Sequence, residues 1–172
     1  MYKLKKAANR QLFLISVLIS PIILRVIKMN NQDTVKLLRE CDAGVKMGLS
    51  SFDEVMNYVH SDRLRSCISE CKAEHEEFAD EMQNLLEKHS DDGKEPNPIA
   101  KSMSWLKTNV MLSVNDSDSV IADLMIDGCN MGIKALSKYL NEYSEADKTS
   151  KDLANRIITS EKRLAEDVRE FL

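Results

Sequence analysis

Glycine, proline and aromatic residues are scarce in this sequence. Its 172 residues include five glycines, three prolines and one tryptophan, and aromatic side chains make up 5%. Low glycine and proline contents, together with abundant Leu, Met, Ala, Glu and Lys, favour helix, because these straight side chains lose little rotamer freedom there. A chain of this length suits one domain with a proper hydrophobic core. We therefore predict an all-α domain.

Several patterns that would indicate a particular chemistry are also missing. No glycine-rich phosphate loop is present, which excludes nucleotide binding by that route. No grouping of Ser, His and Asp stands out as a nucleophilic triad, although a triad assembled in space stays open at this stage. The formal net charge is −4, and basic residues are interspersed with acidic ones. Nucleic acid is therefore not an expected partner.

The four cysteines, Cys41, Cys67, Cys71 and Cys129, do not form a zinc signature, because no C-x-x-C pair occurs. An even count is compatible with disulfides, but the chain has enough apolar residues to hold together without them. We expect reduced cysteines that act as small core hydrophobes, and a cytoplasmic protein.

Residues 1–28 differ from the rest of the chain. Four basic residues precede an apolar run over 12–24, as in a signal peptide. However, no small-x-small cleavage site follows, and the run is shorter than the ~20 residues of a membrane span. Three interpretations stay open: translation that begins at Met29, a membrane anchor over 12–27, and a signal peptide. We assign the folded domain to 29–172 and expect a membrane partner only if the anchor is real.

From residue 32 onward, apolar residues recur at spacings of three and four, which is typical of helices with one buried face. We predict four long helices, of which the first spans 32–59. The second begins at a Ser61–Asp62 cap, the third after a break at 115–118, and the fourth after a turn at 144–148. The predicted inward positions are Val35, Leu38, Asp42, Val45, Leu49, Phe52, Met56 and Val59; Leu64, Ile68, Cys71, His75, Phe78, Met82, Leu85 and His89; Ala122, Ile126, Cys129, Ile133, Leu136, Leu140 and Tyr143; and Ala154, Ile157, Glu161, Leu164, Val168 and Phe171.

A long connection separates the second and third helices. Gly93, Pro96 and Pro98 end the second helix, and a shorter helix with Trp105 is expected over about 99–113.

An internal echo indicates that the first and third helices are copies. The sequence GVKMGL at 44–49 matches GCNMGI at 128–133, and the same offset superimposes the two apolar seams. We therefore predict two duplicated helical hairpins joined by the long connection. Each helical glycine costs nearly 1 kcal/mol against alanine. We expect that cost to be offset by a close approach of helix backbones at the two G-x-x-x-G pairs.

Two hairpins joined by a long crossover is the ferritin-like four-helix-bundle plan. At residue level the chain resembles an uncharacterised bacterial family of ferritin-like domains of unknown function, over about residues 33–172. The motifs that carry the resemblance are Cys41-Asp-Ala-Gly44, Phe78-Ala-Asp-Glu-Met82, Trp105 with Lys107, Ile126-Asp-Gly128 and the region of Tyr139. The resemblance implies the fold and self-association, and it implies no activity.

A ferroxidase site is not expected. Ferritin-like oxidases hold two irons with a carboxylate from each of two helices and a Glu-x-x-His unit from each of the other two. This sequence has no Glu-x-x-His, and Leu164 stands where the histidine after Glu161 would fall.

Four polar residues nevertheless lie on the apolar seams: Asp42, Cys71, His75 and Glu161. One interpretation is a buried Asp42–His75 pair that fixes helix register, and another places these groups at the rim of the bundle. A third is a degenerate or mononuclear site for Fe or Zn, because Cys67, Cys71 and His75 follow at four-residue steps. We expect a non-enzymatic bundle that self-associates, most simply as a homodimer and without a cofactor. The alternative is a metal-binding, redox-active protein.

Overall fold

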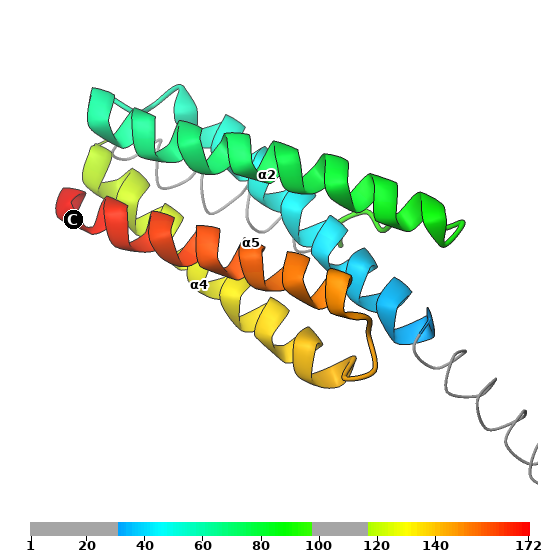
Figure 1. Cartoon of the computed structure of the whole chain (residues 1–172). Helices are drawn as coiled ribbons and strands as arrows, with labels where there is room; N and C mark the ends of the chain where they lie inside the picture. Colours follow the sequence, from blue (N-terminus) through cyan, green and yellow to red (C-terminus); the bar gives the residue numbers. More distant parts are fainter. Residues whose placement is uncertain (1–30, 98–116) are drawn as a thin grey trace, which may run out of the picture.

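The computed structural model describes residues 31–97 and 117–172, and within those ranges the chain is helical with no strand (Figure 1). A helix over 31–56 is followed by α2 (Asp62–Lys88), α4 (Asp118–Glu142) and α5 (Lys148–Asp167). A 3₁₀ turn, η1 (Val168–Phe171), ends the chain. The predicted all-α architecture with four long helices is confirmed.

Two predictions fall on segments that the structure does not describe. The basic and apolar extension over 1–28 and the short helix with Trp105 over 99–113 lie outside the described residues. Among the residues that are described, no helix is long and apolar enough to cross a membrane.

The helices begin where the sequence places capping residues. The hydroxyl of Ser61 accepts a hydrogen bond from the backbone N–H of Leu64, and Ser117 caps α4 in the same way. Asp147 caps α5 through the N–H of Ser150. The first helix ends at 56 instead of the predicted 59. Val59 is still buried, although it lies in the non-helical turn that follows the first helix. Its apolar spacing therefore resembled that of a helical residue, and the prediction extended the helix through it.

The two hairpins are tied together at both ends of the bundle. The carboxylate of Asp118, at the start of α4, accepts hydrogen bonds of 2.9 Å from the backbone N–H groups of His60 and Ser61. At the other end, the hydroxyl of Thr34 accepts one of 2.9 Å from the N–H of Asp147. The turn of each hairpin is thus bonded to the beginning of the other hairpin, which sets their relative register.

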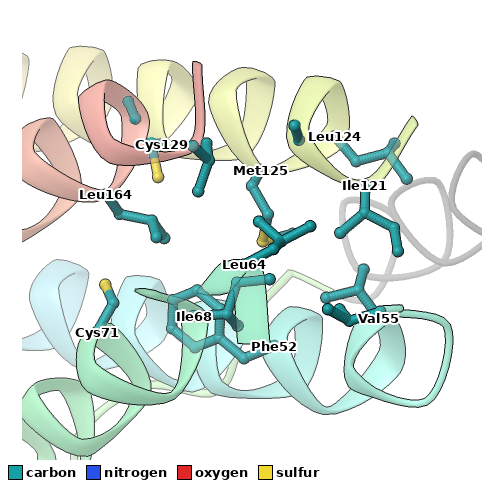
Figure 2. Packing of buried hydrophobic residues seen from close by; sticks show 14 residues of the cluster. Phe52, Val55, Leu64, Ile68, Cys71, Ile121, Leu124, Met125, Cys129 and Leu164 are labelled. Atoms are coloured by element: carbon teal, nitrogen blue, oxygen red, sulfur yellow. The ribbon is translucent and has the colours of Figure 1, made fainter. Parts of the chain in front are cut away.

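The buried side chains form two apolar clusters along the bundle. Figure 2 shows the first, in which Ile68 and Phe52 from one hairpin face Met125 and Leu164 from the other. Its buried members are Phe52, Val55, Val59, Leu64, Ile68, Cys71, Ile121, Ala122, Leu124, Met125, Cys129, Leu164, Ala165 and Val168. The second comprises Leu37, Leu38, Cys41, Val45, Phe78, Met82, Leu86, Leu136, Ala146, Leu153, Ala154, Ile157 and Ile158.

Most predicted inward positions are buried, and on α2 one difference has a simple cause. On α2, Leu86 is fully buried and Leu85 is only half-buried, whereas the prediction placed Leu85 inward. A 3.5-residue repeat drifts against the 3.6-residue turn of a straight helix. Over the length of α2 this drift moves the buried stripe by one residue. The cysteine prediction agrees with the structure, because all four thiols are free and only Cys67 is not fully buried.

Candidate functional site

Between the two apolar clusters each helix contributes one residue to what we call the polar layer: Gly48, His75, Gly132 and Glu161. His75 Nε2 lies 4.0 Å from Glu161 Oε1. A Cβ atom on Gly48 would lie 3.2 Å from His75 Cδ2, and one on Gly132 would lie 2.7 Å from the carboxyl carbon of Glu161. The layer therefore holds two polar side chains, and each faces a glycine on the other helix of its own hairpin.

The ring of His75 is buried and held in one orientation. Its side chain is 1% exposed, and Nδ1 lies 2.9 Å from the carbonyl oxygen of Cys71. A carbonyl only accepts, so Nδ1 carries the hydrogen and the neutral ring has its lone pair at Nε2. The rings of Phe52 and Phe78 contact it edge-on, with centroids 5.1 and 5.8 Å away. Burial lowers the pKa of His75, which keeps the ring uncharged at neutral pH.

Glu161 places a carboxyl group in the same layer without a hydrogen-bond partner for one of its oxygens. Oε2 is buried and unpaired within the described residues. Burial raises the pKa of Glu161 to about 8, so the carboxyl is mainly protonated at neutral pH. His75 and Glu161 are therefore both uncharged there. Their 4.0 Å separation is not a salt bridge and is too long for a direct hydrogen bond.

The helical glycines have a different structural role from the predicted one. The sequence predicted that both G-x-x-x-G pairs bring helix backbones together. Cβ atoms added to Gly44 and Gly128 would meet nothing within 4 Å, and those on Gly48 and Gly132 would meet the side chains of His75 and Glu161. That prediction was wrong, because the second glycine of each pair makes room for a polar side chain and the first lies on an open surface.

Asp42 does not join the polar layer. Its Oδ2 accepts a 2.8 Å hydrogen bond from the backbone N–H of Lys94 and lies 3.1 Å from Nζ of Lys46. The predicted Asp42–His75 pair is absent, because Gly48 occupies the position opposite His75 and lies six residues further along the helix. At 1.5 Å per residue that is a shift of about 9 Å. Asp42 instead fastens the segment that follows α2, where Gly93 has a φ of +81°.

Removing this carboxylate should weaken the fold without affecting the polar layer. Asp42→Ala leaves the N–H of Lys94 without its acceptor, for which we expect a loss of about 1–2 kcal/mol in the free energy of unfolding. Urea denaturation followed by circular dichroism measures the loss. A stability equal to that of the wild type would show that this bond is not formed in solution.

Cys71 lies beside His75, on the side of the ring away from Glu161. Its sulfur is 3.6 Å from Nδ1 of His75 and 3.5 Å from the hydroxyl of Ser160. That hydroxyl donates to Glu74 at 2.6 Å, and Glu74 pairs with Arg163 at 2.5 Å. Burial raises the pKa of Cys71 to about 11, so it is a thiol and not a thiolate at neutral pH. It therefore belongs to a hydrogen-bonded chain between α2 and α5.

The structure thus brings together two of the four predicted ligands, His75 and Glu161, with Cys71 next to them and Asp42 elsewhere. Cys67, at the first of the four-residue steps, packs against the first apolar cluster. Within the described residues, no group of three or more His, Cys, Asp or Glu side chains is arranged to hold a metal ion. Ser160, which is buried, was not singled out from the sequence. The one signal that could have identified it is its position three residues after Ile157, on the inward stripe of α5.

No protein-family model, no curated protein and no solved structure matches this chain. The resemblance to ferritin-like domains consequently rests on the short sequence motifs alone.

Proposed function

We propose that this chain is a non-enzymatic bundle of the ferritin-like plan that works by association with a second copy of itself. The observation that carries the proposal is the composition of α4. It has 6 charged residues in 25, against 12 in 27 for α2 and 9 in 20 for α5. All three helices have an outward face (Figure 1), and a helix with unusually few charges on that face is suited to an interface.

The outward face of α4 is uncrowded near its middle, where it exposes one large apolar side chain. Met131 is 72% exposed, and the neighbouring Gly128 has open space where a side chain would be. The segment 128–133 contains no charge. Methionine adapts its shape to a partner surface, and a C₂ axis through this strip would place Met131 against its equivalent.

The core groups that carry chemistry are in their uncharged forms, which agrees with a non-catalytic role. Burial raises the pKa of Cys129 to about 12 and that of Cys41 to about 12, so neither thiol is activated as a nucleophile. The four free thiols suit a reducing compartment, and we propose the cytoplasm.

We also propose that the two hairpins arose by duplication. Gly48 and Gly132 are 84 residues apart in the sequence, and the side chains that face them, His75 and Glu161, are 86 apart. The difference of two arises because α4 continues ten residues beyond Gly132, to Glu142, whereas the first helix continues eight residues beyond Gly48, to residue 56. Each hairpin would thus contribute one glycine and one polar side chain to the polar layer, at equivalent positions.

The self-association proposal is tested by Met131→Glu. A buried, unpaired carboxylate at the centre of an interface is strongly unfavourable, so we expect the variant to be a monomer at concentrations where the wild-type chain is a dimer. Sedimentation velocity over a concentration series gives the mass. Ser69→Glu adds the same charge to an exposed position of α2 and should leave the dimer intact. A wild-type chain that stays monomeric at all concentrations contradicts the proposal.

A second candidate function, metal binding, is favoured by one specific observation. The polar layer contains an unpaired carboxyl oxygen and an imidazole lone pair, with a glycine facing each side chain. Elemental analysis of chain purified without chelator separates the two candidates, because association alone needs no metal.

A further inference from the structure

The polar layer contains two groups that can donate an electron pair to a ligand. Nε2 of His75 bears the lone pair of the neutral ring. Oε2 of Glu161 is buried without a hydrogen-bond partner within the described residues, and Oε1 of the same carboxyl lies 4.0 Å from Nε2. Both side chains come from the middle of long helices, α2 and α5, that pack directly against each other. The donors are therefore positioned by rigid elements and not by a loop.

The distance between these donors suits an ion better than a direct bond. Nε2 and Oε1 are 4.0 Å apart, which is beyond a hydrogen bond. Zinc-type ions bind nitrogen and carboxylate oxygen at about 2.0–2.2 Å, so one ion can lie between the two atoms. A Cβ atom on Gly48 would lie 3.2 Å from Cδ2 and 3.4 Å from Nε2 of His75, so the glycine lets the ring lie close against the first helix.

The surroundings resemble those of a ligating histidine. The second nitrogen of such a histidine usually donates to a carbonyl or carboxylate, which fixes the tautomer and the direction of the lone pair. Nδ1 of His75 donates to the carbonyl of Cys71 at 2.9 Å, and Phe52 and Phe78 hold the plane of the ring.

We propose that the polar layer binds a single divalent d-block cation, of the Zn²⁺ or Fe²⁺ type, through Nε2 of His75 and the carboxylate of Glu161. This inference rests on the metal-binding candidate and not on self-association. A nitrogen and carboxylate set favours such ions over Ca²⁺ and Mg²⁺, which take six or more oxygen ligands or keep several waters.

The structure also limits the ligand set. Cys71 lies on the Nδ1 side of the ring and is bonded to Ser160, so its sulfur faces away from the ion. Asp42 is occupied by Lys94 and Lys46. The site is therefore mononuclear, and it excludes two of the four ligands that the sequence predicted.

Cobalt(II) is a suitable probe, because its visible absorption reports the ligand geometry. Titration of the purified full-length, metal-free chain with CoCl₂ should give one ion per chain, displaced by Zn²⁺. His75→Gln and Glu161→Gln should each weaken Co²⁺ binding by about 100-fold or more, since each removes a ligand of a two-residue site. Glu161→Gln keeps the shape of the side chain, and its circular dichroism spectrum shows whether the bundle is folded.

Three controls define the site. Cys71→Ser and Asp42→Asn should bind Co²⁺ as the wild type does, and so should a His60→Gln, His89→Gln double variant, which removes the other two histidines. Absence of binding to the wild-type chain, binding that survives both ligand variants, or binding lost in any control would overturn the proposal. Sedimentation of the same proteins is read independently, so failure of the metal site leaves the self-association result intact.

Discussion

The free energy of unfolding should fall by on the order of 3 kcal/mol between pH 5 and pH 8 because of Glu161. Burial raises the pKa of this carboxyl to about 8 in the folded chain, whereas an unfolded chain restores a value near 4.5. Between these two values the folded state binds more protons than the unfolded state. The stabilising contribution of the Glu161 carboxyl is therefore fully present below about pH 4.5, and it is lost as the pH rises through 8.

His75 has the opposite pH dependence. Burial lowers the pKa of the ring, so below its ordinary value of about 6.5 the unfolded chain binds the proton and the folded chain does not. Its contribution is present above that value and is lost as the pH falls through the lowered pKa. The two residues together place the stability maximum of the polar layer in mildly acidic solution.

Glu161→Gln isolates the carboxyl contribution, because it preserves the shape of the side chain and removes the titration. Urea denaturation of wild type and variant in metal-free buffer, at half-unit steps from pH 4.5 to 8.5, gives the difference in unfolding free energy. We expect the unfolding free energy of the variant to increase relative to that of the wild type as the pH rises. A difference that does not vary with pH would mean that the carboxyl is solvated and not buried.

Alanine at two glycines four residues apart on α4 should change stability in opposite directions. Gly128→Ala places a methyl group in open space and adds helix propensity, so a gain of up to about 1 kcal/mol is expected. Gly132→Ala places a methyl group 2.5 Å from Oε2 of Glu161, inside a packed layer. Its propensity gain is outweighed by overpacking, for a net loss of about 1–3 kcal/mol.

A double-mutant cycle identifies the cause of that loss. In a Glu161→Ala background the methyl group of Gly132→Ala has no carboxyl to meet, so the destabilisation should disappear and the substitution should become favourable. Thermal unfolding of the four proteins at pH 6 provides the comparison. A loss of the same size in both backgrounds would show that the backbone of Gly132, and not the space beside it, is what the bundle requires.

The helical layout was predictable because it depends on local properties. Capping side chains at Ser61 and Ser117 and the spacing of apolar residues are encoded in short segments, and each contributes wherever the segment packs. The same spacing indicated that His75 and Glu161 face the core, since each lies at an inward position of its helix.

The partners of those two residues were decided only in three dimensions. Whether His75 meets Asp42, Cys71 or Glu161 depends on the axial register between helices and on the rotation of each, and a shift of about 9 Å along one helix separates the predicted pair from the observed one. Likewise, each of the two G-x-x-x-G motifs contains one glycine on an open surface and one glycine against a polar side chain of the layer. The identical spacing in the sequence does not distinguish them. By itself the sequence determined the helices and their inward faces. The tertiary structure decided which polar groups share the layer, because that depends on packing between segments far apart in the chain.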